Sequence, residues 1–170
     1  LISNVDNKTL SKKEQEAITV LKAWKGSNNL KDVAPTIYNK WIYMYLKNTF
    51  QDELGAEHFK HFLGTHIMKQ IVAKQMANEN SIWWDNIGTK NKKETRSEIL
   101  VASFREAVVS LEKQLGSSVS AWTWSKVHIL EHQHPLGKVA ALRKMFNVGP
   151  FEVPGSNEVI NNLYFDFTDD

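Results

Sequence analysis

The fold class follows from TRSEILVASFREAVVSLEKQLG at residues 95–116. This stretch opens with a Thr-x-x-Glu capping box, in which the Thr hydroxyl and the Glu carboxylate each accept a hydrogen bond from a free backbone N–H at the helix start. Apolar side chains then recur at helical spacing at Leu100, Phe104, Ala107, Val108, Leu111 and Leu115. Gly116 ends the run. The pattern predicts a long helix with one buried face.

Two further helices are predicted upstream. A second capping box, Ser11 to Glu14, begins a helix that Gly26 ends, with Ala17, Val20, Leu21 and Trp24 on one face. Pro35 suits the first turn of the next helix. The apolar residues of that helix cover most of its circumference: Ile37, Tyr38, Trp41, Ile42, Met44, Tyr45 and Leu46. A helix that is apolar on all sides is expected to have several packing partners.

Shorter elements fill the space before residue 95. We expect one short helix over Ala56–Leu63 and another over His66–Ala77, separated by glycines, with Ile67, Ile71 and Val72 facing inward. Residues 78–93 have the composition of a loop. We expect three apolar side chains to anchor this loop: Ile82, Trp83 and Trp84.

The pattern changes after Gly116. Residues 120–124 alternate like an extended segment, and 136–146 predict one short helix among Pro and Gly turns. Residues 162–167 read as a strand with period two. We therefore expect a mainly α segment spanning residues 1–170, helical over 1–116, with a Trp/His/Pro/Gly-rich turn region and a C-terminal strand over 117–170. Because a lone strand leaves its backbone groups unpaired, part of the fold is expected to lie outside these residues.

Composition excludes several functional classes. Net charge is +2, and the 21 basic residues are scattered among 19 acidic ones, so no basic stripe favours a nucleic-acid partner. The longest apolar runs fall short of the ~20 residues that a membrane span needs. The absence of cysteine excludes a thiol nucleophile, a disulfide and a cysteine-based zinc site.

One sequence pattern suggests zinc chemistry. His128-Ile129-Leu130-Glu131-His132 fits the H-x-x-E-H arrangement, in which two His on one helix face hold zinc, and His134 adds a third imidazole. The alternating residues upstream and Pro135 both disfavour the helix that this arrangement needs. A zinc hydrolase built on His128, His132 and His134 is therefore retained only as an alternative, and no metal site is assigned.

Hydroxyl nucleophiles are also considered. The pairs Gly26-Ser27, Gly116-Ser117 and Gly155-Ser156 could in principle be self-cleavage junctions that expose a Ser amine. Each falls at a helix end or a turn, where Gly and Ser are favoured for conformational reasons, so all three are interpreted as turns.

A resemblance to a known family rests on the region around residue 122. Trp122-Thr123-Trp124-Ser125-Lys126-Val127-His128, followed by His134-Pro135-Leu136-Gly137, resembles the W-x-W-G-x-x-H…H-P-L-G region of the penicillin amidase family. Ser125 stands where the family has Gly. Further matches follow in the family's order: Leu21, Trp24 and Gly26, then Trp83-Trp84-Asp85, Gly149-Pro150-Phe151 and Pro154-Gly155-Ser156.

The resemblance implies an N-terminal-nucleophile hydrolase of αββα fold, processed into two chains, that cleaves the amide bond of an N-acyl compound such as a penicillin or an acyl-homoserine lactone. This chain would be an internal or C-terminal-half segment of the nucleophile-bearing β chain, and its C-terminal strand would join a sheet of the whole enzyme. The Ser nucleophile, the oxyanion Asn and any calcium ligands would lie outside it. The partners would be the remaining β chain and the α chain, and the location the periplasm.

No catalytic residue and no cofactor are assigned to the 170 residues, and the piece alone is expected to be inactive. The motif residues are predicted to be structural: Trp122, Trp124, His128, His134, Pro135 and Gly137. A non-catalytic helical interaction module descended from the same family remains the other alternative.

Overall fold

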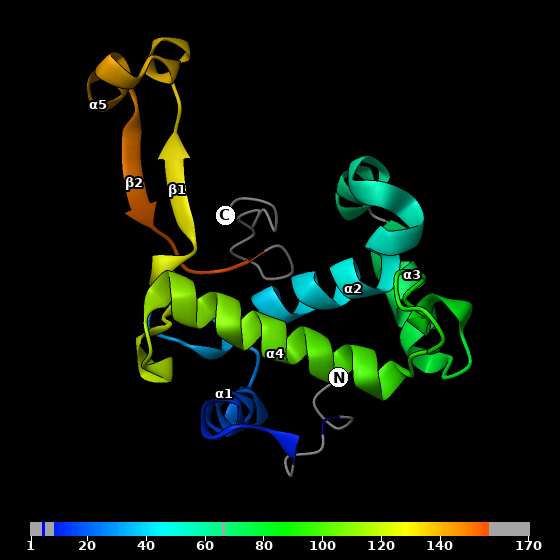
Figure 1. Ribbon diagram of the computed structural model, residues 1–170. Coiled ribbons are helices and arrows are strands. Elements are labelled where there is room, and N and C mark those ends of the chain that lie inside the picture. Colours follow the sequence, from blue (N-terminus) through cyan, green and yellow to red (C-terminus); the bar gives the residue numbers. More distant parts are fainter. Residues whose placement is uncertain (1–4, 6–8, 66, 157–170) are drawn as a thin grey trace.

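The computed structural model describes residues 5, 9–65 and 67–156. These residues form a mainly α protein, as predicted, with one small two-stranded sheet. The four long helices make a body, named here as α1 to α4 with the turns between them, and a hairpin extends away from it (Figure 1). The predicted strand over 162–167 lies outside the described residues.

Both predicted capping boxes are present. Helix α1 (Lys12–Ala23) begins at Ser11, whose hydroxyl accepts from the backbone N–H of Glu14, while the Glu14 carboxylate accepts from Ser11 N–H. Helix α4 (Arg96–Leu115) begins in the same way at Thr95 and Glu98. Gly116, at φ 94°, ends α4 in a conformation that side-chain-bearing residues disfavour.

Helix α2 (Ala34–Leu63) has Pro35 in its first turn, as expected. The predicted helix over residues 56–63 is also present, because α2 consists of two helical stretches that meet at a kink at Gly55. Gly55 has φ 72° and ψ 163°, a backbone conformation that glycine adopts without steric cost. The glycine therefore interrupts the helical conformation, and the second stretch follows directly after it.

Helix α3 (Ile67–Ala77) was predicted, but its inward face was predicted correctly only at Val72. Ile67 and Ile71 are 50% and 37% exposed, whereas Val72 packs against the core. In the following loop, Trp84 is buried within the 3₁₀ turn η3 (Ile82–Trp84), yet Ile82 is 72% exposed and does not anchor the loop. With few apolar residues in a short helix, sequence spacing alone did not identify the packed side.

The core forms where α2 and α4 pack along each other. The Trp41 ring meets Phe104 edge-on at 5.0 Å, and its Nε1–H donates to the Leu100 carbonyl at 3.1 Å. Asn48 bridges the same helices through Ser103 and Glu106. The all-round apolar α2 thus faces α1, α4 and the residue 82–84 turn, which explains why its apolar residues are not confined to one stripe.

The region after α4 differs from the prediction. Residues 119–121 and 124–126 form the 3₁₀ turns η4 and η5 rather than an extended segment. Strand β1 (Ile129–His132) then pairs antiparallel with β2 (Val148–Glu152), a hairpin that the sequence analysis missed. Between the strands lie the 3₁₀ turns η6 (Pro135–Lys138) and η7 (Ala140–Leu142), followed by the short helix α5 (Arg143–Phe146), which falls within the predicted range 136–146 but is only four residues long.

We call residues 129–152 the arm. Figure 1 shows it extending away from the helices, with α5 at the far end. Within the described residues, every helix is too short or too polar to cross a bilayer.

Candidate functional site

The family-like motif around residue 122 forms the base of the arm, which we call the root (residues 122–128 and 153–155). Trp124 is fully buried there. Its backbone N–H donates to the Asp32 carbonyl at 2.7 Å, and its indole Nε1–H donates to the Gly155 carbonyl at 2.9 Å. One tryptophan therefore joins the loop before α2 to the chain that leaves the arm.

His128 closes the root beside Trp124. Its ring stacks on the indole at 4.6 Å with an interplanar angle of 21°, and only 2% of its surface is exposed. Its Nδ1 lies 2.8 Å from the Val153 carbonyl oxygen, and Val153 N–H donates to the His128 carbonyl at 3.1 Å. Because a carbonyl only accepts, Nδ1 carries the proton in this contact. Side chain and backbone together fix the two chain segments at the arm's base.

The Trp122 ring packs into the core of the body, whereas the Trp124 ring packs at the root. Trp122 is fully buried, belongs to the core between α1, α2 and α4, and donates from Nε1 to the Gly116 carbonyl at 2.8 Å. Trp122 and Trp124 therefore have different structural roles. Trp122 holds the end of α4, and Trp124 holds the base of the arm.

The second half of the motif builds the far end of the arm. His134 N–H donates to Asn147 Oδ1 at 3.1 Å, and the His134 ring stacks on Phe146 at 5.3 Å. Pro135 starts turn η6. A Cβ added to Gly137 would come within 1.7 Å of Asn147 Oδ1, so only glycine fits there without rearrangement. The two halves of the motif lie at opposite ends of one hairpin.

The structure contradicts the zinc alternative. Residues 129–132 form a strand, in which a four-residue separation spans roughly 13 Å rather than one helical turn. His128 is held by Trp124 and Val153 at the root, whereas His134 stacks on Phe146 at the far end. Among the described residues, no group of three or more His, Cys, Asp or Glu could hold a metal ion.

A shallow cavity of about 210 Å³ lies beside α4, away from the motif. It is lined by Asn48, Asn86, Lys92, Glu94, Glu98, Ile99, Ala102 and Glu106. Glu94 already accepts from Asn86 N–H and Thr89, and Lys92 pairs with Glu98, so these polar groups hold the loop before α4 in place. The hydrogen bonds and the Lys92 charge lower the pKa of Glu98 to about 2.

A third group of titratable residues lies near the kink in α2. Loss of solvent, a hydrogen bond to Asp52 and the charges of Asp52 and Asp85 raise the pKa of Glu53 to about 7. Asp52 accepts from Ile87 N–H at 2.9 Å and so joins α2 to the loop.

Sequence reasoning missed Val153 and Asn147, the partners of the two motif histidines. Both partners lie on the returning half of the hairpin, and Asn147 acts through its side-chain amide oxygen. The Gly149-Pro150 pair is typical of a turn, but in the structure Gly149 lies inside strand β2. There its hypothetical Cβ would meet the Leu130 carbonyl at 2.7 Å, so it permits close strand pairing.

Comparison with known proteins places this architecture in a family. The family model described as Penicillin amidase matches residues 1–169. The chain is 27% identical over 158 residues to the acyl-homoserine lactone acylase QuiP of Pseudomonas fluorescens strain Pf0-1, covering 90% of this chain and 18% of that protein. It is 26% identical over 164 residues to the QuiP of Pseudomonas aeruginosa PAO1, covering 86% and 19%. The chain thus spans about a fifth of the length of these curated relatives. The match over nearly all 170 residues shows that the chain belongs to the penicillin amidase family.

Proposed function

We propose that these residues are a segment of an amidohydrolase that hydrolyses the carbon–nitrogen bond of N-acyl compounds through an N-terminal Ser located elsewhere in the parent protein. The observation that carries the proposal is the family match over residues 1–169, combined with coverage of only 18–19% of the relatives. In this reaction the terminal amine takes the Ser hydroxyl proton and the oxygen attacks the acyl carbon; the carbon–nitrogen bond breaks as the proton passes to the leaving amine. Water then cleaves the acyl ester, which releases the acid and restores the Ser hydroxyl.

The motif residues act as scaffold in this proposal. Buried hydrogen bonds and stacking account for Trp122, Trp124 and His128. Three others shape the far end of the arm: His134, Pro135 and Gly137. The Nδ1 of His128 is held by a backbone carbonyl and its ring is buried, so this imidazole serves packing rather than proton transfer to a substrate.

The substrate proposed first is an acyl-homoserine lactone, because the similar proteins are named as acylases of that class. A penicillin or another N-acyl compound is the second. The partners are the remaining β chain and the α chain of the parent, the location is the periplasm, and any calcium is held by residues outside this chain.

The test compares the product of the complete natural reading frame with the 170-residue chain. Each purified protein is incubated with N-acyl-homoserine lactones of several chain lengths and with a chromogenic phenylacetyl amide, and free amine is measured. The complete product is expected to turn over at least one substrate and to show a processed Ser N-terminus by mass spectrometry. The 170-residue chain is expected to release no amine above the buffer rate.

Two results would overturn the proposal. Turnover by the 170-residue chain at the rate of the complete product, retained on repurification, would place the nucleophile inside it. A natural reading frame that encodes only these residues, with no turnover, would favour the non-catalytic interaction module.

A further inference from the structure

The arm carries an unusual concentration of uncovered apolar side chains. The described residues include eleven large hydrophobic side chains that are exposed, and six of them fall within residues 129–152. These six are Ile129, Leu136, Val139, Met145, Val148 and Phe151. All five residues of β2 are exposed, so neither face of this strand is covered by the body. Concentrated apolar exposure of this kind marks an interaction surface.

The arm is nevertheless built to hold one shape. At its root, Trp124 and His128 fix both chain segments. At its far end, Arg143 pairs with Glu131 across the hairpin at 2.6 Å. An isolated two-stranded hairpin is only marginally stable in water, so this reinforcement presents an ordered apolar surface. A preorganised surface loses less conformational freedom when a partner binds it.

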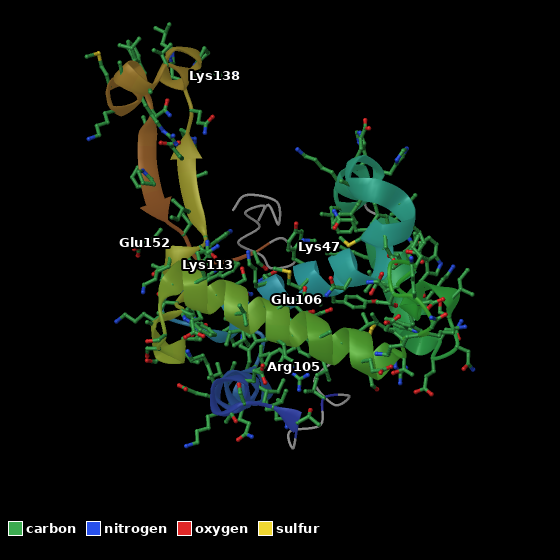
Figure 2. The ribbon with its side chains drawn as sticks, in the orientation of Figure 1. Lys47, Arg105, Glu106, Lys113, Lys138 and Glu152 are labelled. Carbon is green, nitrogen blue, oxygen red and sulfur yellow. The ribbon has the colours of Figure 1, made fainter. Side chains whose placement is uncertain are left out.

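Figure 2 shows the direction in which this surface points. Glu152 lies where the arm meets the body, and Lys138 lies at the far end of the arm. The arm therefore carries its apolar side chains away from the helices rather than folding them back. None of the described residues covers these side chains, so a covering surface would come from outside the described part of the chain.

We propose that the arm is the docking element through which this segment joins the remainder of the parent polypeptide, which covers it with an apolar surface. This inference rests on the proposed function, because it requires the parent to be longer than these residues. The relatives supply the argument for this occupant: more than four-fifths of their length lies outside the match, and the match includes the whole arm. A second copy of the chain is the competing occupant.

The first experiment measures amide hydrogen exchange in the complete natural product and in the 170-residue chain. Docking is expected to slow exchange over residues 129–152 by at least about tenfold in the complete product, while core amides of α4 serve as the internal reference. Equal exchange of the arm in both proteins would overturn the proposal. So would a dimer of the 170-residue chain, seen by light scattering, that arm substitutions dissociate, since the second copy would then be the occupant.

The second experiment uses matched substitutions in the complete product. Val139→Asp with Met145→Asp places charge on the arm, and Ile82→Asp with Val109→Asp places equal charge on similarly exposed positions of the body. The arm pair is expected to lower the yield of processed, active protein at least about tenfold, since burying a charge is costly. The body pair should leave the yield of processed, active protein unchanged. Both pairs should leave the unfolding midpoint of the 170-residue chain unchanged. Equal loss from both pairs would overturn the proposal.

The outcomes also separate this inference from the proposed function. A natural reading frame limited to the 170 residues would overturn both the proposed function and the docking role of the arm. A longer, active product that tolerates the arm pair and leaves the arm unprotected removes only the docking role.

Discussion

The body and the arm are built by opposite means. In the body, α2 and α4 bury large side chains such as Trp41, Tyr45 and Phe104 against each other, so that hydrophobic burial holds the helices in place. In the arm, no strand residue is fully buried, and order comes from backbone pairing, the His134–Phe146 stack and the Arg143–Glu131 ion pair. The difference fits the docking role proposed for the arm, because burial already covers the large apolar side chains of the body whereas those of the arm stay exposed.

The largest effect should come from removing a core side chain of the body. Trp41→Ala deletes a fully buried indole that packs on Phe104 and donates to Leu100, and should lower the free energy of unfolding by about 3–5 kcal/mol. Met145→Ala, at a position 76% exposed in the arm, is the control and should change it by less than about 0.5 kcal/mol. Urea unfolding followed by circular dichroism measures both. A comparable loss from the two changes would contradict the contrast between body and arm.

The next effect concerns the root, where body and arm meet. His128→Ala removes the stack on Trp124 and leaves the half-buried Val153 carbonyl without its side-chain donor, which should cost about 1–3 kcal/mol. Exchange of amides in residues 129–152 should also accelerate, while α4 amides keep their protection. His132→Ala, at an exposed position of β1, serves as the control. Unchanged arm exchange in His128→Ala would show that backbone pairing alone orders the hairpin.

The same contrast explains what could be predicted from sequence. The capping boxes at Ser11 and Thr95 and the helical spacing after them are local signals, and both helices begin where those signals place them. The break before residue 56 was also predicted, because a glycine of positive φ interrupts the regular helical conformation. For such elements the sequence pattern and the tertiary packing point to the same structure.

The arm lacked such local signals. Its strands do not alternate between apolar and polar residues, because neither face packs on the body. The alternation from Trp122 to Trp124 suggested an extended segment. Instead, Trp122 follows turn η4 and Trp124 begins turn η5, and the two buried rings have different packing partners. The roles of His128 and His134 depend on Val153 and Asn147, which are distant in sequence, so spacing alone could not reveal them.

A smaller effect would test how far local signals stabilise the body. Thr95→Ala removes the hydroxyl that accepts from Glu98 N–H at the start of α4, and should cost about 1 kcal/mol. Ser97→Ala, an exposed position in the first turn of the same helix, should be neutral or slightly stabilising, because alanine has the higher helix propensity. Thermal unfolding midpoints of the two variants measure the difference. A loss for Ser97→Ala equal to that for Thr95→Ala would show that the cap contributes nothing specific.

The smallest expected effect lies at the bend of α2. In the folded chain the pKa of Glu53 is raised from 4.5 to about 7 by loss of solvent and by Asp52 and Asp85, so the folded state binds more protons than the unfolded chain between these values. Its contribution is therefore fully present below about pH 4.5 and is lost as pH rises to about 7. Because the Glu53 side chain is exposed and screened by solvent, the loss should be below about 1 kcal/mol.

Glu53→Gln, which stays uncharged, should flatten this part of the curve of unfolding free energy against pH. Glu57→Gln, at an exposed position on the same helix, should leave it unchanged. Glu98, whose pKa is lowered to about 2, contributes stability that is lost only as pH falls below about 4.5, so the two windows do not overlap. A curve that keeps its slope between pH 4.5 and 7 in Glu53→Gln would show that the bend next to Gly55 does not hold a carboxyl in its protonated form. In that case the charge on Glu53 would not weaken α2 as the pH rises, and the body would differ from the arm more clearly.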